Sequence, residues 1–244
     1  MRLVFNFFCL VFLASITILS CTDESDEVIV DERDEQYRLY DYYIDAYGNE
    51  GIVCYVDTSY TVSGAIIVIS ADEAYLPWGP LGDAVCRDDS VATAFLSSPS
   101  FGLSMLQNMT LKGIEHYPAM NWCANKNSDE LAPNSSSWRL PTQFEFAKIF
   151  LGVKNYPQKI HSNLNELNNA LKNIGATTIE EDNYYWTCNE DYNTTMSSVS
   201  DNNRKDLAIP ITVNNKTTAD KNYWIKKNKY YVRAIKYIYY RDKY

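Results

Sequence analysis

Polar and aromatic side chains suited to ligand binding gather late in the chain, in "NEDYNTTMSSVSDNNRKD" (189–206) and "NNKTTADKNYW" (214–224). Aromatic rings such as those of Tyr192 and Trp224 could stack on a sugar, because each has a flat apolar face. Carboxylates and amides beside them could hydrogen-bond the sugar hydroxyls, and the candidates are Asp191, Asn193, Asp201 and Asn202. A plain solvated loop is the alternative interpretation of the same residues.

Glu145 and Cys188 are the candidates for a catalytic base and a nucleophile. Thr142-Gln143-Phe144-Glu145 matches the capping box at a helix start, which gives Glu145 a structural task. An activated thiol needs nearby cations or a helix start, but "WTCNED" supplies only acids around Cys188. The sequence has no G-x-S-x-G, P-loop or H-E-x-x-H motif, and its cysteines and two histidines form no metal-binding pattern. We therefore expect a non-catalytic protein without a cofactor or metal.

The first residues carry an export signal. Residues 1–20 have a charged start, a short apolar block and small residues, as a secretory signal does. Ile18-Leu19-Ser20-Cys21 resembles the lipobox of bacterial lipoproteins, which implies acyl chains on Cys21 that hold the protein on a membrane. An ordinary signal peptide with a chance cysteine is the alternative.

Residues 21–37 form an acidic segment that is too charged to pack and is expected to be a flexible tether. Between residues 22 and 36, eight acidic residues oppose Arg33, a balance of −7 out of the net −9. Acids directly behind the lipidated cysteine resemble the signal that sends some lipoproteins to the outer face of the outer membrane. We expect an outer-membrane protein facing the exterior, with a periplasmic orientation as the alternative.

The remaining residues, 38–244, are enough for one domain with a sizeable core. Residues 220–244 carry eight basic and two acidic side chains, a local +6, but no nucleic-acid-binding module accompanies them, so we expect no nucleic-acid partner. Four cysteines remain in this domain, and their three possible disulfide pairings stay open: Cys54, Cys86, Cys123 and Cys188.

Hydrophobic periodicity predicts a mixed α+β domain. Strands are expected at about 40–47, 51–57, 64–70 and 184–188, with an irregular loop over 71–99. Helices are expected after residues 100, 117 and 142, and a stripe at Ile160, Leu164, Leu167, Leu171 and Ile174 predicts a further one that Asn163 caps and Gly175 ends. "KYYVRAIKYIYY" (229–240) predicts one long central strand beside the first strand.

Four segments in order resemble the Lcl C-terminal domain family of bacterial surface and exported proteins: "YPAMNWC", "WRLPTQFEF", "YYWTCNE" and "YYVRAIKY". The resemblance covers about residues 50–240, and the chain departs from the pattern at Phe146, Cys188, Ile235 and Lys236. It implies a C-type lectin-like fold, with adjacent terminal strands in one sheet, two main helices and long irregular loops. Its motif residues are expected to be structural: Trp138, Leu140, Pro141, Thr142, Glu145, Trp186 and Arg233.

Related folds bind ligands through their late loops, so the resemblance implies a surface module that recognises a glycan or a protein. Calcium is not expected, since the Glu-Pro-Asn and Trp-Asn-Asp signatures of sugar-binding lectins are absent. Two alternatives remain. One is an accessory subunit of a fimbrial or uptake assembly, and the other is an enzyme of the formylglycine-generating type, to which the fold is distantly similar.

Overall fold

Two β-branched segments form the centre of the molecule. The structure is a computed structural model, and it describes residues 37–57, 63–85, 99–127, 133–134, 136–150, 159–161, 163–190, 205–213 and 224–241. Strands β2 (Glu50–Asp57) and β3 (Ser63–Ser70) pair as an antiparallel hairpin with a register shift between Val53 and Tyr55. Seven of the eight β2 residues are buried, as expected for a strand covered on both faces.

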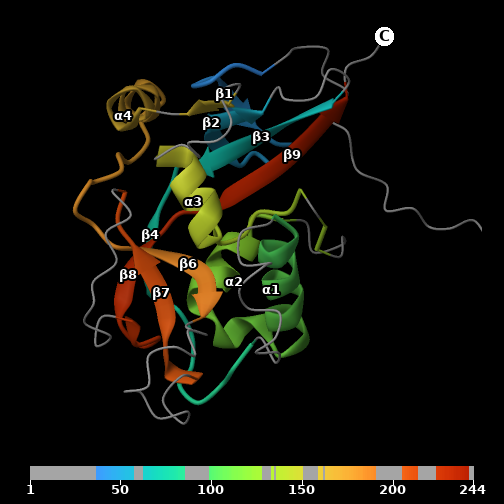
Figure 1. Cartoon of the computed structure of the whole chain (residues 1–244), viewed down its shortest axis with the longest axis vertical. Coiled ribbons are helices and arrows are strands. Elements are labelled where there is room, and N and C mark those ends of the chain that lie inside the picture. The colour runs from blue at the N-terminus through green and yellow to red at the C-terminus, as the bar shows by residue number, and fades with distance from the viewer. Residues whose placement is uncertain are drawn as a thin grey trace, which may run out of the picture.

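The first sheet has the order β1-β2-β3-β9 and is antiparallel throughout. Its edges are the short β1 (Tyr42–Ile44) and the longer β9 (Ile235–Arg241), and β5 (Lys159–His161) also pairs with β2. The second sheet, below the first in Figure 1, has the order β4-β8-β6-β7. Its strands are β4 (Ala74–Pro77), β8 (Lys229–Val232), β6 (Tyr185–Glu190) and β7 (Ala208–Ile211), and only β6 and β8 are parallel.

The α+β class is confirmed, but two predictions about the last strand are wrong. The segment 229–240 divides into β8 and β9, which belong to different sheets. It divides because Arg233 lies buried between them and donates to the carbonyls of Ser70 and Ala71 and to the Glu73 carboxylate. The terminal strands share a sheet without being neighbours, since β9 pairs along its whole length with β3. The C-type lectin-like arrangement stays a prediction.

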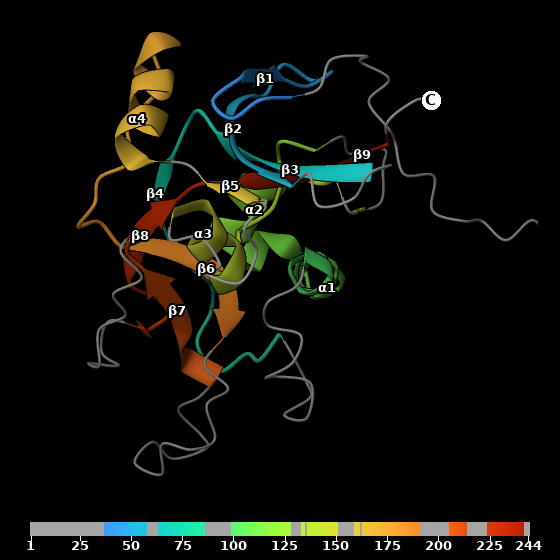
Figure 2. The same ribbon diagram turned by 45° about the horizontal axis from the view of Figure 1, so that its top comes forward.

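Helices cover both faces of the first sheet (Figure 2). On one face lie α1 (Pro99–Leu111), the 3-10 turn η1 (Ile114–His116) and α2 (Pro118–Ala124), whose buried side chains meet Val53, Ile66 and Val68. On the other face lie α3 (Gln143–Phe150) and α4 (Leu164–Asn173), against Ile52 and Ile67. The helix starts predicted after residues 100, 117 and 142 are close to those observed, and the described residues contain four α-helices where the family resemblance implies two main ones.

Helix α4 begins later than its apolar stripe predicts, because Ile160 belongs to β5. The Asn163 side chain accepts from the Asn165 N–H at 2.9 Å and caps the helix. At the other end Gly175 has φ 73°, and the Ala176 N–H donates to the Leu171 carbonyl at 2.9 Å, as in a Schellman motif. Both end signals predicted from the sequence are confirmed.

A strand was missed in the segment predicted to be an irregular loop, since β4 lies there and pairs with β8. Trp78 follows β4 and is fully buried, and its indole N–H donates to the Thr187 carbonyl at 2.8 Å. Cys54, Cys123 and Cys188 are all buried thiols, so no disulfide joins any two of them; Cys86 lies outside the described residues. No helix in the described ranges is long and apolar enough to span a membrane.

Candidate functional site

The predicted capping box is present at the start of α3. Thr142 Oγ1 accepts from the Glu145 N–H at 3.0 Å, and Glu145 Oε2 accepts from the Thr142 N–H at 2.8 Å. Glu145 also receives two hydrogen bonds from the Arg139 guanidinium, at 2.8 and 2.6 Å, in a fully buried ion pair. Burial alone would lower the pKa of Arg139, but the charge of Glu145 and its hydrogen bonds raise it above the ordinary value. Every polar atom of the Glu145 carboxylate thus has a structural partner.

The other motif residues also hold the frame together. Trp138 is buried, and its indole N–H donates to Asp45 Oδ2 at 2.7 Å. This hydrogen bond connects the segment before α3 to the turn between β1 and β2. The Pro141 carbonyl accepts from the Cys188 N–H at 2.8 Å. Trp186 is buried and donates to the Leu76 carbonyl at 2.9 Å. Leu140 is fully buried as well.

A buried charge network lies beside the second sheet, where β6 ends and the chain approaches β8. The Lys226 ammonium is 0 % exposed, donates to Glu190 Oε1 and to the Asp83 carbonyl at 2.7 Å, and lies 4.5 Å from the centre of the Trp78 ring. Glu190 accepts from the Val85 N–H at 3.0 and 3.1 Å. Burial lowers the pKa of Lys226, and the charge of Glu190 opposes this shift.

This network joins three places where the chain leaves or re-enters the described ranges. Val85 and Glu190 are the last described residues before 86–98 and 191–204, and Lys226 comes just after the segment that ends at residue 223. The predicted ligand residues Asp191, Tyr192, Asn193, Asp201 and Asn202 lie outside the described residues, as does Cys21. Trp224 is described and is half-buried two residues before Lys226. Their role in binding therefore stays a prediction.

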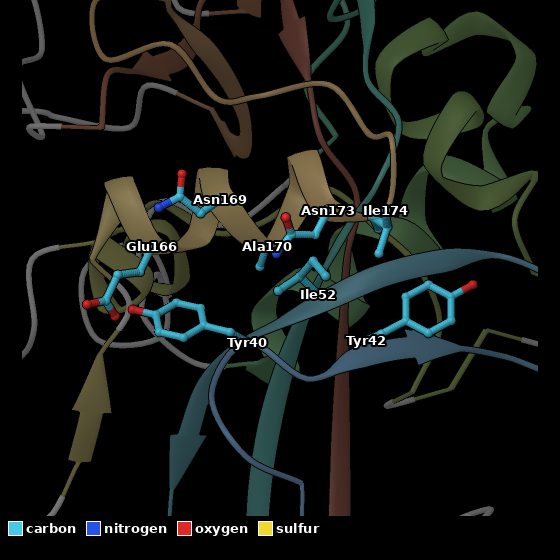
Figure 3. A pocket seen from close by; sticks show the side chains of 8 residues that line it. All are labelled: Tyr40, Tyr42, Ile52, Glu166, Asn169, Ala170, Asn173 and Ile174. Carbon is cyan, nitrogen blue, oxygen red and sulfur yellow. The ribbon is translucent and has the colours of Figure 1, made fainter.

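A groove of about 420 Å³ lies between α4 and the first two strands (Figure 3). Its strand side is made by Tyr40, Tyr42 and Ile52, and its helix side by Glu166, Asn169, Ala170, Asn173 and Ile174. Positions 166, 169 and 173 recur at three- and four-residue spacing, so they follow one face of the helix. The groove therefore combines two phenol rings, an apolar floor, a carboxylate and two amides.

Tyr40 is held in one orientation beside this groove. Its φ of 72° lies in the left-handed region, which is uncommon for an aromatic residue. Its hydroxyl accepts from the Asn163 N–H at 2.7 Å and interacts with Glu166. Burial raises the pKa of the Tyr40 hydroxyl, and the hydrogen bond to the Glu166 carboxylate adds to the increase. Tyr42 donates to Glu50 Oε1 at 2.8 Å while its side chain stays 45 % exposed.

This groove cannot be predicted from the sequence, because its two sides are more than 110 residues apart in the chain. The polar residues of 164–174 are those expected on the solvent side of an amphipathic helix, and nothing in the sequence places them beside Tyr40 and Tyr42. For metals, no group of three or more His, Cys, Asp or Glu side chains in the described ranges is arranged to hold an ion.

No protein-family model matches this chain, and no curated protein matches it either. The fold is similar to that of a fimbrial protein from Bacteroides ovatus. The two share 16% identity with a TM-score of 0.51, and the match covers 82% of this chain and 48% of that one. The chain thus spans about half the length of the fimbrial protein. At this identity the similarity concerns the fold alone.

Proposed function

We propose that this protein is a lipid-anchored, non-catalytic subunit of a fimbrial-type assembly on the outer face of the outer membrane. The observation that carries the proposal is the similarity in fold to a fimbrial protein over 82% of the chain. The lipobox-like segment ending at Cys21 supports the anchor, and the acidic segment behind it supports an exterior position. Of the alternatives from the sequence, the assembly subunit is the one that this similarity favours.

A non-catalytic role agrees with the environments of the two candidate catalytic residues. Glu145 is fully buried in an ion pair and a helix cap. Cys188 is a fully buried thiol in β6, where a substrate has no direct access. Thiol labelling of the folded protein tests the enzyme alternative, because a reactive Cys188 would revive a formylglycine-generating activity.

The assembly proposal is tested in the native host by crosslinking intact cells and capturing a tagged chain from the outer membrane. We expect a stoichiometric surface-protein partner and cleavage of the chain when intact cells are treated with protease. The matched control is Cys21→Ala, which removes the site of lipidation, so the chain should be missing from the outer membrane and the capture should be abolished. A chain that is protected from protease and is captured alone would contradict the proposal.

A further inference from the structure

We propose that the groove between α4 and β1 binds a neutral saccharide. This goes beyond the proposed assembly role, because it concerns a different surface and a different kind of ligand. The groove's volume of about 420 Å³ falls within the range of small-ligand sites. Its composition, phenol rings and apolar carbons with a few polar groups, is also that of such sites.

Two amides on α4 supply the hydrogen-bonding groups that a saccharide needs. Asn169 and Asn173 are exposed, and neither side chain has a hydrogen bond within the described part of the chain. An amide both donates and accepts, as does a sugar hydroxyl, so each can satisfy the other. Four residues along a helix correspond to about 6 Å, so the two amides can reach hydroxyls at separate positions of one sugar chain.

The neighbouring Asn168, in contrast, has an amide whose hydrogen-bonding groups already have partners in the protein. Its Oδ1 accepts from the Ile179 N–H at 2.8 Å and its Nδ2 donates to the Ile179 carbonyl at 2.8 Å. Asn168 therefore holds α4 to the following segment. The side chains of Asn169 and Asn173 make no comparable hydrogen bonds within the described residues.

The strand side of the groove supplies surfaces for the C–H faces of a sugar ring. Figure 3 shows Ile52 between Tyr40 and Tyr42, with the Asn173 amide directed toward it and Asn169 at the outer rim. A backbone in the left-handed region costs about 1–3 kcal/mol at a non-glycine residue, and such strain is often found at binding sites. At Tyr40 the contacts with Asn163 and Glu166 hold the ring in place before a ligand arrives, which reduces the entropy lost on binding.

Charge separates a neutral saccharide from anionic ligands. Among the described residues no Lys or Arg lines the groove, and the carboxylates of Glu166 and of Glu50, beside Tyr42, would repel an anionic sugar or a phosphate. A cationic peptide would be attracted, and its carbonyl oxygens could also accept from the Asn169 and Asn173 amides, so a Lys-rich peptide is the competing ligand in the test. The phenol rings and apolar carbons of the groove favour the C–H faces of a neutral, hydroxyl-rich ligand.

The test uses the full-length lipidated chain in detergent on an array of neutral hexose and N-acetylhexosamine oligosaccharides, followed by titration calorimetry with the best binder. We expect at least a tenfold loss of affinity for Asn169→Ala/Asn173→Ala and for Tyr42→Ala. The matched control Asn165→Ala changes an exposed amide of the same helix outside the groove and should keep affinity within twofold. Thermal melts should show all three variants folded.

Three results would overturn the proposal. The array could show no binding to any neutral saccharide, or binding could persist unchanged in the groove variants, which would place the site outside the groove. A Lys-rich peptide could also bind more tightly than every saccharide. Each result is independent of the crosslinking experiment, so the groove and the assembly role fail or hold separately.

Discussion

Replacing Glu145 by Gln should destabilise the domain far more than its place in a helix cap suggests. The substitution keeps the shape of the side chain but removes the charge that Arg139 faces at 2.6 and 2.8 Å. Since Arg139 is 1 % exposed and Glu145 0 %, the guanidinium would stay buried without its counter-ion. Breaking a buried pair in this way costs about 3–5 kcal/mol. In a domain of roughly 200 residues this corresponds to a fall in Tm of about 6–20 °C.

Two variants separate the ion pair from the cap. Thr142→Ala removes only the hydroxyl that accepts from the Glu145 N–H, so it should cost about 1 kcal/mol. Arg139→Met/Glu145→Leu removes both charges and should recover most of the stability, because an apolar replacement leaves no unpaired ion. Urea unfolding followed by circular dichroism gives the three free energies. The reasoning fails if Glu145→Gln costs no more than Thr142→Ala.

Three further perturbations test other contacts. Burial would raise the pKa of Asp45, but hydrogen bonds and the charge of Lys236 hold this pKa below the ordinary 3.8. The stability that the Asp45 carboxylate adds is therefore present above pH 4 and is lost as the pH falls through the lowered pKa. The difference in Tm between wild type and Asp45→Asn should shrink from pH 6 to pH 2. Gly102→Ala places a Cβ 2.5 Å from the Arg139 guanidinium, which its ion pair holds in place. This substitution should destabilise the folded domain by about 1–3 kcal/mol despite the better helix propensity of Ala. A calorimetric Tm at or above that of wild type would contradict this. Burial raises the pKa of Tyr185 to about 12 from 10.0, so the contribution of this phenol to stability is lost as the pH rises from 10 to 12. The Tm of Tyr185→Phe should fall less steeply than that of wild type over this interval, and an equal fall would refute the prediction.

Local sequence signals predicted the helix ends well, because the two residues of each capping interaction lie within a few positions of one another in the chain. The Thr142–Glu145 box and both ends of α4 follow from sequence spacing alone. The division of 229–240 into two strands could not be predicted in the same way. A segment that is apolar on both faces has no alternation to show where it changes sheets, and the acceptors that hold Arg233 come from residues 70–73 and 177–178.

The candidate binding residues were harder to predict for a related reason. Sequence patterns show residue types, but only the fold shows which polar groups already have partners. Asn168 and Asn169 are identical neighbours, yet the first is held by two hydrogen bonds to Ile179 and the second lies at the rim of an open groove. In the motif from Trp138 to Glu145 the indole N–H of Trp138, the guanidinium of Arg139 and the carboxylate of Glu145 already have buried partners, so these groups are not available to a ligand. Function in this fold is therefore to be sought where amides and phenols remain exposed among the described residues, as they do beside α4.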